Sequence, residues 1–142
     1  MRALLDVNVL IALLDQGHVH HAVARDWLAA NIGQGWASCP ITQNGCIRIM
    51  SQPAYPAPLA PAQVAERLRA ATLAPYHAFW PDDLALVSFE GLRWTSILGS
   101  RQITDAYLLA LAVRNRGRFV TFDRAAPLDA VEGATAGHLV VL

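Results

Sequence analysis

The sequence contains no lysine, so all eleven of its strongly basic side chains are arginines. Phospho-acceptor receiver domains and haloacid-dehalogenase-type phosphatases place acidic residues at strand ends, but both rely on a lysine beside those carboxylates. The absence of lysine therefore excludes both classes. Eleven acidic residues bring the formal net charge to zero, so contact with a nucleic acid would need a local basic patch.

Cysteine is also scarce, and long apolar runs are missing. Cys39 and Cys46 are the only cysteines, and in an apolar neighbourhood they are typical of reduced core thiols rather than of a disulfide or a metal pair. No uninterrupted apolar run reaches the length of a membrane span. Asp6 and Asp15 interrupt the first apolar stretch, which also lacks the cleavage site of a signal peptide. We therefore expect a cytoplasmic protein that contacts no membrane.

The composition is that of a globular protein. The chain has 142 residues, of which 54% are hydrophobic and 15% charged, and a domain of about this size buries roughly two-thirds of its unfolded surface. There is no internal repeat, low-complexity segment or domain boundary, which predicts a single domain over residues 1–142. So apolar a composition also leaves apolar side chains at the surface, which favours a protein partner or a homodimer.

Apolar runs with the length of strands alternate with segments that have the period of helices. Residues 3–5 form an apolar run that ends at Asp6 and passes at once into another, the pattern of a buried strand followed by a helix. Further strands are predicted at residues 36–40, 77–80, 119–122 and 138–142, and helices at residues 9–14, 20–32, 41–50, 61–73, 84–94 and 105–115. This alternation predicts an α/β fold of three layers, with a mostly parallel central sheet and helices on both faces.

Acidic side chains stand where two of these strands end. Asp6 and Asp123 each follow a buried strand, and Asp105 begins the helix that leads into the second of them. In a parallel sheet the first two emerge at the same edge, where ligands bind in folds of this kind. At about 4 Å and an effective dielectric of about 20, each pair of carboxylates would cost on the order of 4 kcal/mol.

A cation would remove that repulsion. Hard oxygen ligands, without a convincing set of cysteines or histidines, favour Mg²⁺ or Mn²⁺ over Zn²⁺. Metals held in this way activate water for attack on phosphate esters. The alternative is that the three carboxylates, and Asn8 beside the first of them, are unrelated helix caps or surface groups. Asp82 and Asp83 fit that second interpretation, as the start of the helix predicted at residues 84–94.

Three segments resemble those of PIN-domain ribonucleases, specifically the VapC-type toxins of type II toxin–antitoxin pairs. They are residues 4–10 (LLDVNVL), 103–112 (ITDAYLLALA) and 119–124 (FVTFDR). Residues 39–48 (CPITQNGCIR) and 79–83 (FWPDD) are similar to a subgroup of the same family. The resemblance covers nearly the whole chain. It implies a PIN-like fold, a Mg²⁺-dependent endoribonuclease and a small antitoxin that plugs the acidic groove.

The resemblance also assigns roles to individual residues. Asp6, Asp105 and Asp123 match the catalytic, metal-binding carboxylates of the family, and Asn8 and Thr121 match polar positions beside the metal. Contacts with the RNA backbone are expected from three arginines, namely Arg48, Arg101 and Arg124.

The chain departs from the family pattern at Gln43, where many members carry a fourth acid. An amide brings no charge, so we expect one metal to bind well and a second to bind weakly. Gln43 is also the main support for an alternative, a catalytically weak or inactive PIN-like module that binds RNA or protein.

Overall fold

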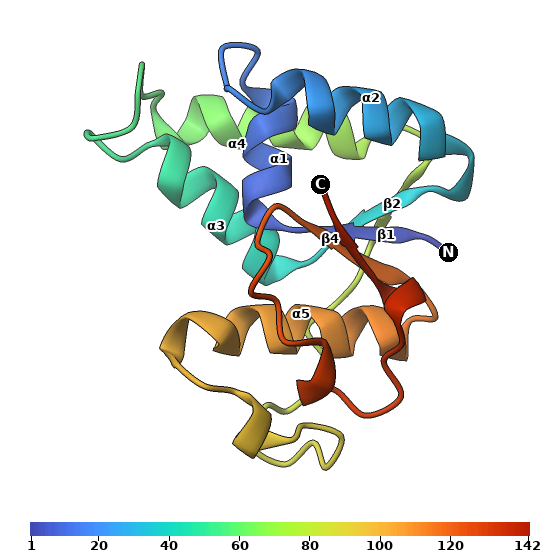
Figure 1. Ribbon diagram of the computed structural model, residues 1–142. Helices are drawn as coiled ribbons and strands as arrows, with labels where there is room; N and C mark the ends of the chain where they lie inside the picture. The colour runs from blue at the N-terminus through green and yellow to red at the C-terminus, as the bar shows by residue number, and fades with distance from the viewer.

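Five parallel strands form one sheet across the middle of the computed structural model, which describes residues 1–142 (Figure 1). The strands are β1 (Ala3–Leu5), β2 (Trp36–Ser38), β3 (His77–Phe79), β4 (Arg118–Thr121) and β5 (Leu139–Val141). Their order across the sheet is β3-β2-β1-β4-β5, so β1 lies in the centre between β2 and β4. The predicted parallel sheet is confirmed, and the carboxyl ends of all its strands lie along one edge.

Helices cover both faces of the sheet, which confirms the predicted three layers. On one face lie α1 (Val7–Leu14), α2 (His21–Asn31), α3 (Pro40–Met50) and α4 (Pro61–Thr72), and on the other lies α5 (Ile103–Arg114) (Figure 1). Side chains alternate along β1, so that Ala3 and Leu5 enter the core under α1 while Leu4 enters the core around α5. No helix is long and apolar enough to span a membrane.

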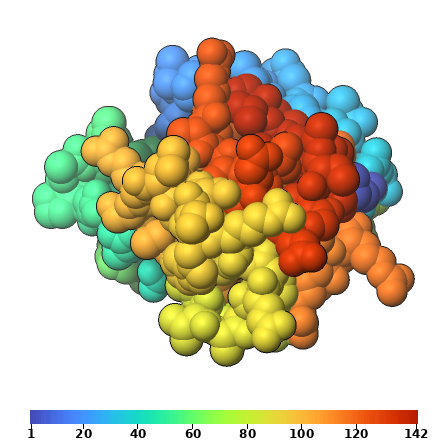
Figure 2. Space-filling view, turned by 60° about the horizontal axis from the view of Figure 1, so that its bottom comes forward, coloured from blue at the N-terminus to red at the C-terminus, as the bar shows by residue number.

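α5 is buried nearly all round. Eight consecutive residues of this helix, Asp105 to Ala112, are buried. The sheet covers one side, and apolar side chains from two irregular segments, including Leu92 and Val131, complete the core on the other. Figure 2 shows these segments, drawn in yellow and in orange to red, spread over that face of the molecule. A helix covered on every side needs no polar face, which explains its nearly continuous apolar sequence.

The prediction of a helix at residues 84–94 is wrong. The segment is irregular and is followed by short 3-10 turns at Trp94–Ser96 and Ser100–Gln102. Leu84 and Leu92 are both buried against α5, and Leu92 forms an antiparallel bridge with Val131. These long-range contacts satisfy the apolar residues of the segment without a helix, so tertiary packing overrides the local pattern.

The other predicted elements are present, with small differences at their ends. α1 begins at Val7 rather than at residue 9, because Asp6 caps it. α5 begins at Ile103 and continues directly from the preceding 3-10 turn, so Thr104 lies inside the helix and is not its cap. The start of α5 therefore brings Asp105 into the first turn, as the sequence predicted.

Candidate active site

Asp6 lies at the junction between the central strand and α1. Its side chain is buried, at 6% exposure, and accepts hydrogen bonds from Val7 N at 2.7 Å and from Thr121 Oγ1 at 2.6 Å. Burial raises the pKa of the Asp6 carboxyl above its ordinary value, the two hydrogen bonds oppose that rise, and the charge of Asp123 adds to it. Asp6 is thus both a helix cap and a carboxylate directed at the end of β4.

A chain of hydrogen bonds joins the ends of β1 and β4. Thr121 Oγ1, besides donating to Asp6, accepts from Asn8 Nδ2 at 3.3 Å and from Asp123 N at 3.0 Å. Asn8 Oδ1 in turn accepts from Phe122 N at 3.3 Å. One hydroxyl and one amide therefore hold two acidic residues from opposite ends of the sequence in a fixed arrangement. Asn8 and Thr121 are the two residues that the sequence predicted as supporting polar groups beside the metal.

Asp105 carries the largest electrostatic perturbation at this edge of the sheet. It is only 8% exposed. Burial, the negative charges of Asp6 and Asp123, and a hydrogen bond with the Asp123 carboxyl together raise the pKa of Asp105 to about 7. The structure therefore brings the three sequence-predicted carboxylates near one another. No group of three or more His, Cys, Asp or Glu side chains, however, stands at the spacing of a ready-made metal site.

The donor set fits a hard divalent cation. All three groups offer carboxylate oxygens, and mutual repulsion favours a positive charge between them. Burial of carboxylates without an opposite charge costs free energy of folding. A bound cation would therefore stabilise the folded protein. The arrangement can hold a divalent cation, and a cation bound there would attract phosphate oxygens to the site.

A groove of about 490 Å³ opens beside Asp6, between α1, α3 and the start of α5. Gly45 permits this close approach of the helices, since a Cβ there would lie 2.6 Å from a methyl group of Val7. Asn44 and Arg48, one turn apart on α3, line the groove. Of the three arginines predicted to contact RNA, Arg48 is the one that shares a groove with Asp6.

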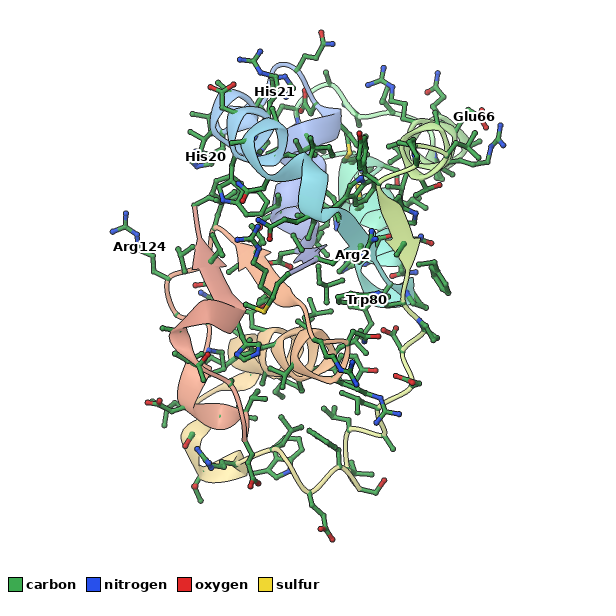
Figure 3. All side chains as sticks on the ribbon, turned by 90° about the vertical axis from the view of Figure 1, so that its right-hand side faces the viewer. Arg2, His20, His21, Glu66, Trp80 and Arg124 are labelled. Atoms are coloured by element: carbon green, nitrogen blue, oxygen red, sulfur yellow. The ribbon has the colours of Figure 1, made fainter.

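Arg101 and Arg124 lie elsewhere. Both are exposed, Arg101 in the turn before α5 and Arg124 in the segment after β4. Arg124 lines a separate surface hollow together with Gln102. Figure 3 shows its guanidinium extended away from the ribbon. The structure does not bring either arginine into the groove.

Gln43 does not line the groove either. Its Nε2 donates to Ser38 Oγ at 3.0 Å, and Ser38 Oγ lies 2.8 Å from His77 Nε2. The next residue, Asn44, is exposed and lines the groove in its place. One residue along a helix turns a side chain by about 100°, so a shift of one position in a short motif moves it to another face. Gln43 is therefore bonded to the end of β2 and is not one of the residues that line the groove beside Asp6.

Asp82 is the residue that sequence reasoning missed. Its Oδ2 accepts from Ile41 N at 3.1 Å, so Asp82 caps α3 and not the helix predicted after it. Its Oδ1 is buried without a hydrogen-bond partner, and the residue lines the same groove as Asp6. Its position just beyond β3 is the signal that could have found it, because parallel strands end at one edge. Asp83 instead pairs with Arg114 at the surface, at 3.3 Å.

Comparisons with known proteins identify the relatives of this chain. A family model described as "PIN domain" matches residues 3–133. Ribonuclease VapC44 of Mycobacterium tuberculosis is 51% identical over 142 residues, which is the whole of both chains. Ribonuclease VapC39 of the same organism is 43% identical over 143 residues, again with full coverage of both.

A solved structure shares the fold at low sequence identity. The crystal structure of Mycobacterium tuberculosis VapC20, described as a toxin that cleaves the sarcin–ricin loop, aligns with a TM-score of 0.62 and 14% identity. The alignment covers 94% of this chain and 99% of that one. The family match, the two full-length relatives and the shared fold lead to one conclusion: the chain belongs to the PIN-domain family, among its VapC-type ribonuclease toxins.

Proposed function

We propose that this chain is an endoribonuclease that hydrolyses RNA phosphodiester bonds with Mg²⁺, or Mn²⁺ as a substitute, bound by Asp6, Asp105 and Asp123. The observation that carries the proposal is the state of Asp105. A buried carboxyl whose pKa is raised to about 7 by burial and by two neighbouring acids is a group that a cation would stabilise. The names of the two full-length relatives, both called ribonucleases, support RNA as the substrate.

The residues of the site have different roles in the proposed reaction. The three carboxylates are the catalytic, metal-holding groups. Thr121 and Asn8 keep the Asp6 and Asp123 ends of the site in register through their hydrogen bonds. Mg²⁺ held there supplies positive charge that stabilises the scissile phosphate and acidifies water for the attack. Because Asp6 and Asp105 are buried, bulk water would compete little with the substrate phosphate for the metal that they hold.

The groove on α3 provides a path for the RNA backbone. Arg48 lines it with Asp6 and would neutralise a phosphate next to the cleaved one. Arg101 and Arg124 lie outside the groove and would act only on flanking phosphates of a longer substrate.

The partner is proposed to be a small antitoxin protein, as the VapC relatives imply. Val19, Val87 and Leu98 are 85%, 90% and 84% exposed, so large apolar side chains remain available for a protein contact or for a homodimer. The same proposal takes residues 1–142 as one domain and places it in the cytoplasm, where the free buried thiols Cys39 and Cys46 stay reduced.

A second candidate function is an inactive or weakly active module that binds RNA or protein. Two observations favour it. The carboxylates are not at ready-made ligand spacing, and the groove presents the uncharged Asn44 where a fourth acid would strengthen metal binding.

Cleavage and growth assays distinguish the two functions. The purified wild type should cleave single-stranded RNA in Mg²⁺ and stop in excess EDTA. Expression alone should slow growth, and co-expression with the adjacent small reading frame should restore it. Asp6→Ala should relieve the growth defect, whereas equal growth inhibition by wild type and Asp6→Ala, with no cleavage by either, would favour the binding module.

A further inference from the structure

Three aromatic rings lie in a row beside the candidate site. The rings of His20 and Phe122 are stacked, with centroids 4.7 Å apart and planes 26° from parallel. The ring of His18 lies 5.7 Å from that of His20 at a tilt of 45°, and His18 Nδ1 accepts from His20 N at 3.1 Å. His20 is exposed, while Phe122 is half-buried beneath it. The row therefore presents an aromatic surface to solvent.

The hydrogen-bond network of the site holds this row in place. Phe122 directly precedes Asp123, and its backbone N donates to Asn8 Oδ1 at 3.3 Å. Asn8 in turn donates to Thr121, which donates to Asp6. The backbone of Phe122, which carries one ring of the row, is thus held by the same groups that hold the carboxylates.

The row and the groove lie on opposite sides of Asp6. In the sheet, β1 stands between β2 and β4. The groove is formed on the β2 side by α3, whereas Phe122 continues from β4. Figure 3 shows His20 at the start of α2, near the strand ends of the last part of the chain, on the same side of that view as Arg124. An RNA strand that crossed the carboxylates from the groove towards β4 would therefore run on the side of Phe122.

Helix capping does not account for His20. It occupies the residue before α2 but makes no side-chain capping hydrogen bond. Its neighbour Val19 is 85% exposed, so residues 19 and 20 face solvent. The ring of His18 is tilted against that of His20 rather than stacked on it, and His20 is exposed. An exposed ring that already stacks on one neighbour is the kind of surface on which nucleobases stack in single-stranded nucleic acid sites.

We propose that His20, supported by Phe122, is a stacking platform for one unpaired base of the RNA, adjacent to the nucleotide whose phosphate lies at Asp6 and Asp123. This inference rests on the proposed cleavage of RNA. Stacking tolerates every base, because each has an aromatic face. The platform therefore sets the register of the strand across the carboxylates and requires that the substrate be single-stranded at that position.

The test combines variants of the platform with substrates that lack one base. His20→Ala removes the ring, His20→Trp keeps a larger one, and Tyr76→Ala is the control. Tyr76 is 46% exposed and precedes β3, so it lies at the opposite edge of the parallel sheet. The substrates are single-stranded RNA oligonucleotides in which each nucleotide in turn is replaced by an abasic residue.

His20→Ala should raise KM about 5- to 100-fold, with kcat changed much less, as loss of one stacked base predicts. His20→Trp should restore KM, and Tyr76→Ala should leave it unchanged. One abasic position should raise KM for the wild type by a similar factor but add nothing in His20→Ala. A role of His20 in packing alone would lower the rate on every substrate alike and would show no such coupling.

These experiments distinguish a failure of the stacking proposal from a failure of the proposed ribonuclease function. If the wild type cleaves RNA and His20→Ala has the same KM on every substrate, the platform is wrong and the ribonuclease stands. If His20→Ala instead loses only the complex with the antitoxin, the row is a protein contact and the platform is also wrong. A wild type that neither binds nor cleaves RNA overturns both.

Discussion

Thr121 and Asp6 stand 115 positions apart in the sequence, yet the Thr121 hydroxyl donates a 2.6 Å hydrogen bond to the Asp6 carboxylate. The register of β1 and β4, in which Leu5 lies opposite Val120, brings them together. Both groups are buried, at 0% and 6% exposure. The bond is therefore a charge-assisted contact that water cannot replace.

Removal of this hydroxyl should cost stability and weaken metal binding. Thr121→Val keeps the shape of the side chain but leaves a buried oxygen of Asp6 without its donor, at a cost of roughly 1–3 kcal/mol. Thr121→Ser should retain most of the stability. Urea unfolding of the metal-free proteins at pH 8 measures the difference. A Thr121→Val protein as stable as the wild type would mean that this bond does not hold Asp6.

The stability of the metal-free protein should fall as pH rises towards neutrality, and Asp105 should be a cause. Its pKa is about 7 in the folded protein, against an ordinary value of 3.8. Between those values the folded state holds a proton that the unfolded state has lost, so unfolding becomes easier as pH rises, by up to about 1.4 kcal/mol per pH unit. Unfolding from pH 4 to 8 in EDTA should show a shallower decline for Asp105→Asn, and equal slopes would contradict the assignment.

Binding of Mg²⁺ should show the opposite dependence on pH. A ligand that binds only the folded state raises the melting temperature, and Asp105 must lose its proton before it can ligate. The increase in melting temperature with Mg²⁺ should therefore be larger at pH 8 than at pH 6. The combined Asp6→Asn, Asp105→Asn and Asp123→Asn variant should lose most of it. A triple variant that responds to Mg²⁺ as the wild type does would place the metal elsewhere.

The orientation of α3 predicts which uncharged side chain determines the Mg²⁺ concentration needed for half-maximal cleavage. Asn44 lines the groove with Asp6, whereas Gln43 donates to Ser38. Asn44→Asp should lower the Mg²⁺ concentration for half-maximal cleavage, because an added carboxylate strengthens Mg²⁺ binding. Gln43→Glu, its matched control, should leave that concentration unchanged. The reverse result, with Gln43→Glu the more effective, would mean that α3 is rotated by one position in the working enzyme.

The sequence was sufficient where a local pattern alone determines the structure. An apolar run that stops at an acid predicted both Asp6 and Asp123, because parallel strands must end at one edge. The helical pattern of residues 105–115 placed Asp105 in the first turn of a helix, where the structure has it.

The sequence was insufficient where long-range contacts decide. Whether position 43 or 44 faces the groove depends on how Gly45 packs against Val7, which no local pattern records. Asp82 was interpreted as the start of a helix that does not form, because Leu84 and Leu92 pack against α5 instead. Its actual partner, the backbone of Ile41, comes from a segment 41 residues away.

The most direct test of the central claim is the rate of single-turnover RNA cleavage as a function of Mg²⁺ concentration. The wild type is compared with Asp105→Asn and with Asp129→Asn, which changes an exposed carboxylate outside the groove. If Asp6, Asp105 and Asp123 hold the metal, the rate rises with Mg²⁺ in the wild type and in Asp129→Asn. In Asp105→Asn it should be at least 100-fold slower at every concentration, which is about 2.7 kcal/mol of activation free energy. An Asp105→Asn protein that cleaves at the wild-type rate with the same Mg²⁺ dependence would contradict the account.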